Sequence, residues 1–125
     1  MNKLLALAKT LRGKNGCPWD KSITLADIPK NLIEESEEIR EAIEKEDWEN
    51  LKEEIGDLLF NLCLMMTIAE EKGHFKPEDI ITHNAKKITE RHTWVFGEDK
   101  ANTPEEAIAL WNKNKAKKKT SSSSQ

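Results

Sequence analysis

Four carboxylates, arranged as two pairs, are the side chains of this sequence best suited to chemistry. Glu35 and Glu38 lie three residues apart in one helical segment, and Glu54 and Asp57 lie three residues apart in the next. This spacing puts both members of a pair on one face of a helix. Four carboxylates without a histidine or cysteine among them offer only oxygen ligands, which favours Mg²⁺ and also suits Mn²⁺. The spacing therefore predicts a site for hard divalent cations.

The segment that carries Glu54 and Asp57 is apolar almost all the way round the helix. Residues 51–69 read LKEEIGDLLFNLCLMMTIA, and polar side chains break the apolar surface mainly along one stripe, formed by Asn50, Glu54, Asp57 and Asn61. A carboxylate in such surroundings must be paired, protonated or bound to a cation. A small single-chain bundle rarely covers such a helix on every side, so the pattern also predicts an oligomer.

The other pair lies on a preceding helix, expected at about 28–45. On a helical wheel Glu35 falls within the apolar face of this helix, and Glu38 falls on its border. The acids expected to point into solvent are Glu34, Glu37, Glu41 and Glu44. A short turn joins this helix to the next, so the two should be antiparallel neighbours, with each pair about 9 residues from the turn. The four carboxylates are therefore expected to face one another.

Composition indicates one helical domain with an acidic body. The chain has 125 residues, of which 34% are charged and only nine are glycine or proline. Residues 1–112 hold 15 basic and 23 acidic side chains, which argues against nucleic-acid binding as the main activity. The remaining lysines gather at the end of the chain. We expect a folded domain at 1–116 and a disordered, Lys/Ser-rich tail at 117–125.

Cysteine usage and hydropathy suggest a cytoplasmic protein. Cys17 and Cys63 form no zinc or redox spacing, and reduced thiols are the default. The apolar run near the N-terminus is broken by Lys9 and is too short for a targeting signal. We also expect no membrane-spanning segment.

The rest of the chain predicts an all-α fold, a bundle of four or five helices completed by dimerisation. Start signals are a possible capping box from Thr24 to Asp27, an N-cap at Asp47 and the run Thr103-Pro104-Glu105-Glu106. The helices expected besides 28–45 lie at about 2–12, 47–72, 78–92 and 104–116. Residues 14–22 and 93–102 are expected to be loops.

Basic and aromatic side chains recur at helical spacing in the C-terminal part. Lys87 and Arg91 are four residues apart, as are Trp111 and Lys115. Taken alone, each pair fits a solvated basic face or a packed tryptophan. Taken together with metals, they offer what a nucleoside triphosphate needs, because cations bind phosphates and an aromatic plane stacks on a base. Trp19, in the first loop, either packs into the core or lines a ligand site.

These motifs resemble the MazG nucleoside triphosphate pyrophosphohydrolases, in the all-α NTP pyrophosphohydrolase superfamily. The matching stretches are GCPWDKSIT (16–24), LIEESEEIREAI (32–43), LKEEIGDLLFNL (51–62), KITERHTWVFG (87–97) and ALWNKNK (109–115). The resemblance implies Mg²⁺ ligation by Glu35, Glu38, Glu54 and Asp57. It also implies hydrolysis of NTPs or dNTPs to monophosphate and pyrophosphate, by a dimer or tetramer. Its nucleotide contacts would fall on Lys87, Arg91, Trp111 and Lys115.

The expected mechanism is attack of water on the α-phosphorus with Mg²⁺ bound to the four carboxylates. Glu34 or Glu53 could orient or deprotonate the water, and the sequence does not choose between them. Two alternatives stay open. One is a non-enzymatic helical binding module with structural carboxylates, and the other is a nucleic-acid-associated protein that acts through the lysine-rich tail.

Overall fold

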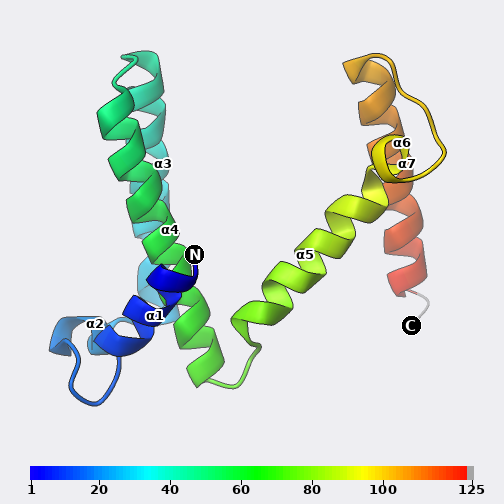
Figure 1. Cartoon of the computed structure of the whole chain (residues 1–125). Helices are drawn as coiled ribbons and strands as arrows, with labels where there is room; N and C mark the ends of the chain where they lie inside the picture. The colour runs from blue at the N-terminus through cyan, green and yellow to red at the C-terminus, as the bar shows by residue number, and fades with distance from the viewer. Residues whose placement is uncertain (124–125) are drawn as a thin grey trace. The chain divides into compact units, whose positions relative to one another are not determined.

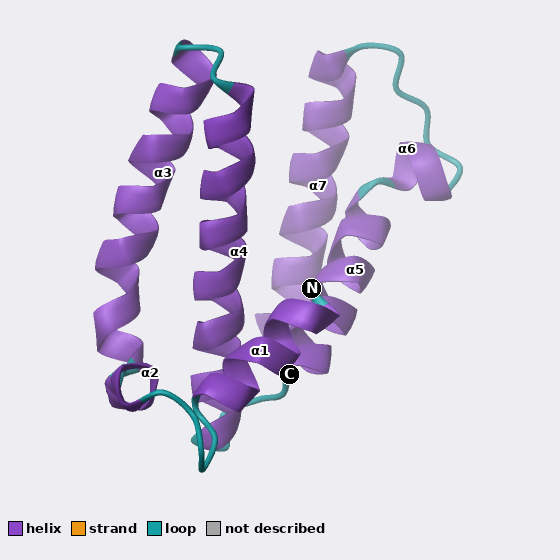
Figure 2. Ribbon diagram, turned by 60° about the vertical axis from the view of Figure 1, so that its left-hand side comes forward, coloured by secondary structure: helices purple, strands orange, loops and turns teal. Residues whose placement is uncertain are grey.

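The N-terminal part of the chain is a helical hairpin crossed by a short helix. The computed structural model describes the backbone of residues 1–123 and the side chains of residues 1–117. The chain divides into two compact units, Met1–Pro77 and Glu78–Gln125. In the first unit, α3 (Ile28–Glu44) and α4 (Trp48–Glu71) lie side by side, and α1 (Asn2–Leu11) packs across the C-terminal part of α4 (Figures 1 and 2).

The core of this unit lies where α1, the start of α3 and the second half of α4 meet. Its buried members are Ala8, Ile28, Cys63, Leu64 and Ile68. Leucines and other apolar side chains pack around them while partly exposed. Because this core occupies one end of the hairpin, it fixes the register of α4 against α3 and so the level of the side chains along both helices.

The ends of α3 and α4 are formed by the same backbone motif. After α3, Asp47 N donates to Ala42 O at 2.9 Å and Glu46 N donates to Ile43 O at 3.1 Å, with Glu46 at φ 54°. This is a Schellman motif, which needs a left-handed residue and usually employs glycine. After α4 the same pattern places Gly73 at φ 76°. The sharp turn after α3 lets the chain reverse within three residues, so that the two helices become antiparallel.

Most of the predicted start signals are present. The Thr24–Asp27 capping box forms, with Thr24 N donating to Asp27 Oδ2 at 2.8 Å, and it opens the 3₁₀ helix η1 (Leu25–Asp27) that leads into α3. The Asp47 carboxylate caps α4 by accepting from Asn50 N at 3.2 Å. Thr103 Oγ1 accepts from Glu106 N at 3.2 Å at the start of α7.

The second unit holds α5 (Pro77–Arg91), which begins at the boundary, α6 (Thr93–Phe96) and α7 (Pro104–Ser123). Asn114 on α7 joins them: its Nδ2 donates to Arg91 O at 3.0 Å and to Thr93 Oγ1 at 2.9 Å. No strand occurs within residues 1–123, so the all-α prediction is confirmed. None of the helices described here is long and apolar enough to cross a membrane.

The secondary structure differs from the sequence prediction in both expected loops and at the end of the last helix. The two segments expected to be loops each contain a short helix, α2 (Pro18–Ser22) and α6. In α2, Pro18 and Asp20 in the first turn favour a helical start. The last helix runs beyond residue 116 to Ser123, since lysine and alanine favour helix and neither glycine nor proline interrupts them. Residues 124–125 of the tail, predicted to be disordered at 117–125, lie outside the described residues.

Candidate active site

Three carboxylates from the two helices of the hairpin meet midway along it. Glu35 and Glu38 on α3 and Glu54 on α4 each have a carboxylate oxygen within 4.8 Å of the others. Glu54 is only 8% exposed, Glu35 is half-buried and Glu38 is exposed. The i, i+3 spacing on α3 and the antiparallel register set by the short turn bring the side chains to one level. The facing arrangement expected from the sequence is therefore formed by three of the four predicted ligands.

The electrostatics of this cluster are those of acids held close together. The pKa of Glu54 is raised, chiefly by a hydrogen bond with Glu35 that favours its protonated form, while a bond with Glu38 acts in the opposite direction. Burial and the charges of Glu35 and Asp57 add to the rise. The pKa of Glu38 is raised as well, first by hydrogen bonding with Glu54 and then by its negative charge. Ionising all three carboxyls is therefore unfavourable without a cation.

Two oxygen atoms of the cluster lack a hydrogen-bond partner within the described part of the chain. Glu35 Oε2 and Glu54 Oε2 are buried and accept no hydrogen bond from the described residues. Buried polar atoms are nearly always satisfied, so two unsatisfied carboxylate oxygens in one cluster fit a positively charged ligand. All the potential metal-ligand atoms of the cluster are carboxylate oxygens, which hard cations prefer. The residues present thus fit a divalent cation such as Mg²⁺.

The fourth predicted ligand, Asp57, lies beside the cluster and faces a pocket. It is exposed and does not belong to the group of three, although its charge acts on Glu54. The pocket has a volume of about 410 Å³ and opens next to the carboxylates. Its lining comes from α2, α3, α4 and the connection after α2: Trp19, Asp20, Ile23, Ile28, Asn31, Glu34, Glu35, Asp57, Phe60, Asn61 and Leu64.

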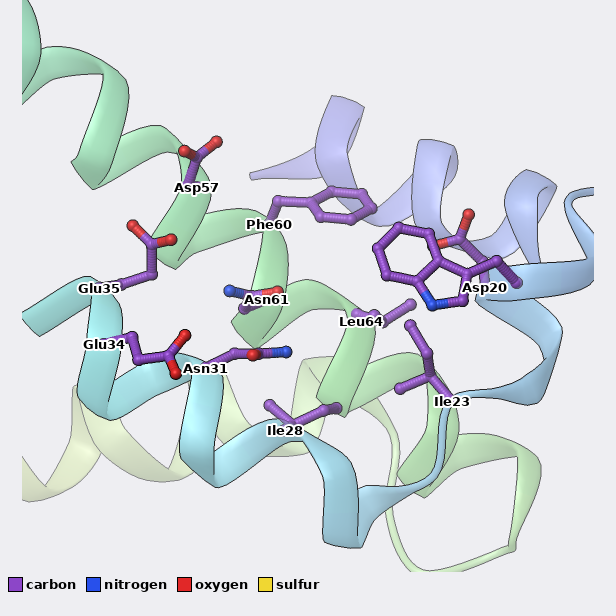
Figure 3. A pocket seen from close by; sticks show the side chains of 11 residues that line it. Asp20, Ile23, Ile28, Asn31, Glu34, Glu35, Asp57, Phe60, Asn61 and Leu64 are labelled. Carbon is purple, nitrogen blue, oxygen red and sulfur yellow. The ribbon is translucent and has the colours of Figure 1, made fainter.

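The pocket changes in character from one end to the other. Figure 3 shows Glu34, Glu35 and Asp57 on one side, the amides of Asn31 and Asn61 next to them, and Ile23, Ile28 and Leu64 beyond. An acidic end beside an apolar end, with amides between them, can hold a molecule that carries both a charged group bound through cations and a flat, apolar part. Such a pocket is polar where metal-bound anions would lie and apolar where a ring would stack.

Trp19 and Asp20 close the pocket from the short helix α2. Trp19 is 73% exposed, so the alternative that placed it in the core is wrong, and its position on the pocket wall accords with the other. Asp20 is only 8% exposed. The sequence reasoning did not select Asp20, Asn31 or Asn61. Two signals pointed to the amides: Asn31 lies four residues before Glu35 on the same face of α3, and Asn61 belongs to the polar stripe of α4.

The two candidate bases differ in position. Glu34 lines the pocket and is exposed there, one residue from the carboxylate cluster. Glu53 is exposed on α4 and is not part of the pocket lining. The geometry of the first unit thus favours Glu34 over Glu53 as a group that can reach a bound molecule.

The second unit brings together two of the predicted nucleotide contacts. The Arg91 guanidinium carbon lies 5.3 Å from the centre of the Trp111 ring, and Arg91 Nε is buried without a hydrogen-bond partner among the described residues. Trp111, His92 and Trp94 pack ring against ring and, with Ala107 and Ile108, line a second pocket of about 210 Å³. Lys87 is half-buried, whereas Lys115 is exposed and lies outside this lining.

Comparison with known proteins places these features in a family. The MazG nucleotide pyrophosphohydrolase domain matches residues 24–96. Escherichia coli K12 nucleoside triphosphate pyrophosphohydrolase is 38% identical over 112 residues, 89% of this chain and 43% of that protein. The Bacillus subtilis protein YabN, described as uncharacterized, is 39% identical over 120 residues, 95% of this chain and 24% of that protein. The chain thus spans less than half the length of these relatives.

A solved structure agrees with the observed fold. The crystal structure of a MazG-related protein from Thermotoga maritima superimposes with a TM-score of 0.77 at 32% identity, covering 93% of this chain and 99% of that one. The family match covers more than half of the chain and includes α3 and α4 with all their carboxylates. The resemblance drawn from the sequence motifs is therefore confirmed: this chain belongs to the MazG nucleotide pyrophosphohydrolase family.

Proposed function

We propose that this chain hydrolyses nucleoside or deoxynucleoside triphosphates to the monophosphate and pyrophosphate, in a reaction that depends on Mg²⁺. The observation that carries the proposal is the carboxylate cluster of Glu35, Glu38 and Glu54, with two buried, unpartnered oxygens beside an acidic pocket. Family membership and the name of the Escherichia coli relative support the same reaction class.

The proposed ligands are Glu35, Glu38, Glu54 and Asp57, and Mn²⁺ would suit the same oxygens. Bound there, Mg²⁺ would offset the charge of a triphosphate and favour attack of water at the α-phosphorus. Asp57, at the border of cluster and pocket, would join the site from the pocket side. Glu34 is the preferred group to orient the water and accept its proton, and Glu53 is the less favoured candidate because it lies outside the pocket lining.

The remaining contacts are assigned by chemistry. Lys87, Arg91 and Lys115 are proposed to bind phosphates, and Trp111 and Trp19 to stack on the base. The Arg91 guanidinium already lies over Trp111, and its buried Nε is free to donate. A cation and an aromatic plane held together in this way suit a nucleotide, which carries an anion and a ring.

A homodimer or homotetramer is proposed as the working form. α4 carries apolar side chains on the sides that α1 and α3 leave uncovered, and Ile55 is 44% exposed. A second copy of the chain would bury such side chains. No nucleic-acid partner is expected from the acidic body, and the cytoplasmic location stays a prediction.

The test is a Mg²⁺-dependent assay on NTPs and dNTPs that detects pyrophosphate and orthophosphate separately. Wild-type protein should release pyrophosphate and monophosphate, and chelation should abolish the reaction. Glu54→Ala and Asp57→Ala should each lower turnover ~100-fold or more, because a lost ligand weakens metal binding at least as much as a lost supporting group. Glu44→Ala, which removes an exposed acid at the far end of α3, should leave turnover unchanged.

Three outcomes would contradict the proposal. Full activity in either ligand variant would show that these carboxylates do not form the site. Orthophosphate in place of pyrophosphate would mean a phosphatase that cuts elsewhere along the phosphate chain. Folded protein that acts on no nucleotide would favour the binding-module alternative.

A further inference from the structure

Trp19 and Asp20 lie on α2, a helix of five residues that is too short to be stable by itself. α2 is a single short helix. The connection before it is held to the end of α1 by Cys17 N, which donates to Leu11 O at 2.7 Å, and to α2 by Lys21 Nζ, which donates to Lys14 O at 2.8 Å. Isolated helices of this length are unstable in water, so the position of α2 must be set by contacts outside it. The pocket wall formed by Trp19 and Asp20 therefore depends on what holds the other end of this segment.

Arg12 holds that end. The Arg12 Nη1 atom donates to two backbone carbonyls of the segment, Asp20 O and, at 2.9 Å, Ile23 O. These carbonyls lie at the last turn of α2 and directly after it. The Arg12 side chain is only 10% exposed, although it stands at the end of α1 near the surface. One guanidinium nitrogen thus binds a carbonyl within α2 and the carbonyl of the residue directly after it.

The other side of the same guanidinium binds α4. Arg12 Nε donates to Glu71 Oε1 at 3.0 Å, and Nη2 donates to Glu71 Oε2 at 2.9 Å. This two-pronged pairing needs the planar fork of arginine, which lysine lacks. Glu71 is the last residue of α4, the helix that also carries Glu54 and Asp57. Arg12 therefore ties the segment with Trp19 and Asp20 to the helix that bears half of the carboxylates.

We propose that Arg12 and Glu71 are a positioning pair, which holds Trp19 and Asp20 on the wall of the pocket and thereby governs nucleotide binding. The nucleotide part of this inference rests on the proposed function. Neither residue lines the pocket, so the pair acts through the segment that it holds. The ends of α1 and α4 and the short α2 lie together at the end of the hairpin opposite its turn (Figure 2), as this linkage requires.

The neighbouring ion pair provides a matched control. Lys9 and Glu70 pair at 3.4 Å between the same two helices, and the Lys9 side chain is 52% exposed. Among the described residues, this side chain makes no hydrogen bond or ion pair with the segment after α1. Glu70→Gln removes one ion pair between α1 and α4 without touching the carbonyls of Asp20 and Ile23. Glu71→Gln and Arg12→Lys remove the pair that holds α2.

The experiment combines steady-state kinetics with fluorine NMR of protein labelled with 5-fluorotryptophan, in which Trp19→Phe assigns the Trp19 resonance. In Glu71→Gln and Arg12→Lys the Trp19 resonance should shift, and KM for the triphosphate should rise about tenfold while kcat changes little. The Mg²⁺ concentration for half-maximal activity should stay the same, because the carboxylates are not altered. Glu70→Gln should match wild type in all three measurements.

The results distinguish a positioning role of Arg12 and Glu71 from a purely structural one. A lower melting temperature in Glu71→Gln with an unmoved Trp19 resonance and an unchanged KM would reduce the pair to a structural role and overturn the inference. An equal effect of Glu70→Gln would overturn it as well. If wild-type protein hydrolyses no nucleotide, the proposed function fails, but the Trp19 resonance still tests the positioning: a shift supports it and no shift overturns it.

Discussion

At the scale of single residues, the position that suits Glu54 to metal binding is unfavourable for its charged form, which lowers the stability of the fold. Its side chain is 8% exposed, one of its oxygens has no partner, and its pKa lies above the ordinary value of 4.5 because of Glu35 and burial. A carboxyl with a raised pKa binds its proton more tightly in the folded than in the unfolded chain. It therefore stabilises the fold below the unfolded pKa, and this stabilisation is lost as the pH rises through the folded pKa.

Glu54→Gln should remove this pH dependence. In chelator at pH 7 the variant should melt a few degrees higher than wild type, because an amide carries no charge to repel Glu35 and Glu38. The difference in melting temperature should shrink as the pH falls to 4, where the wild-type carboxyl regains its proton. Thermal melts from pH 4 to 8 measure it, and added Mg²⁺ should stabilise wild type but not the variant. A constant difference across this range would show that Glu54 does not titrate as inferred.

The sequence alone predicted the carboxylates that the structure brings together at the candidate site, but not the other residues that line its pocket. The periodicity of α4 isolated Glu54 and Asp57, because a charged stripe on an apolar helix is visible from spacing. Asp20 could not be found in this way, since it lies in a short helix whose position depends on Arg12. A tertiary contact of one side chain with two distant carbonyls leaves no periodic trace in the sequence. For the same reason, the sequence did not decide whether Trp19 packs into the core or faces a ligand site.

At the scale of elements, the connection from α1 to α2 depends on a close approach of two backbones. A Cβ added at Gly16 would lie 2.1 Å from Leu11 O and 2.6 Å from Thr10 O. Both are backbone atoms, which cannot move aside as a flexible side chain can. Glycine at this position therefore lets the chain fold back onto the end of α1, which puts α2 and its tryptophan in place.

Gly16→Ala should destabilise the protein by about 1–3 kcal/mol, the usual cost of forcing an extra carbon into a filled space. Gly56→Ala is the matched control, because a Cβ there meets no atom within 4 Å among the described residues outside its own helix backbone. That change should instead stabilise α4 by up to ~1 kcal/mol. Urea denaturation of both variants measures the two effects, and equal stability of Gly16→Ala and wild type would contradict the argument.

Some helix ends could be predicted from the neighbouring residues alone, and others could not. The starts of η1, α4 and α7 followed from capping residues, which act within one helical turn. The end of α7 did not, because lysine-rich sequence is compatible both with helix and with a solvated tail. Similarly, the sequence did not predict the left-handed backbone of Glu46, because glycine usually occupies this position after the C-cap of a helix.

At the scale of the whole molecule, α4 carries exposed apolar side chains, among them Ile55, which is 44% exposed. The expected consequence is a dimer or larger assembly at micromolar concentration, measured by sedimentation velocity. Ile55→Glu should shift the protein toward monomer, because burying an unpaired carboxylate in an apolar interface is unfavourable. Lys52→Glu adds an acid to the same helix at a strongly exposed position and should leave the assembly intact. A strictly monomeric wild type would contradict the prediction.

A cation bound at the carboxylate oxygens of Glu35 and Glu54, as proposed, would also link the lifetime of the protein to its surroundings. A cation that binds only the folded chain stabilises it by mass action, and the fraction of unfolded chains falls as the cation concentration rises. Proteases attack mainly such opened chains, so degradation should speed up when divalent cations become scarce. The two oxygens on Glu35 and Glu54 would then make the abundance of this protein, as well as the proposed catalysis, follow the supply of metal.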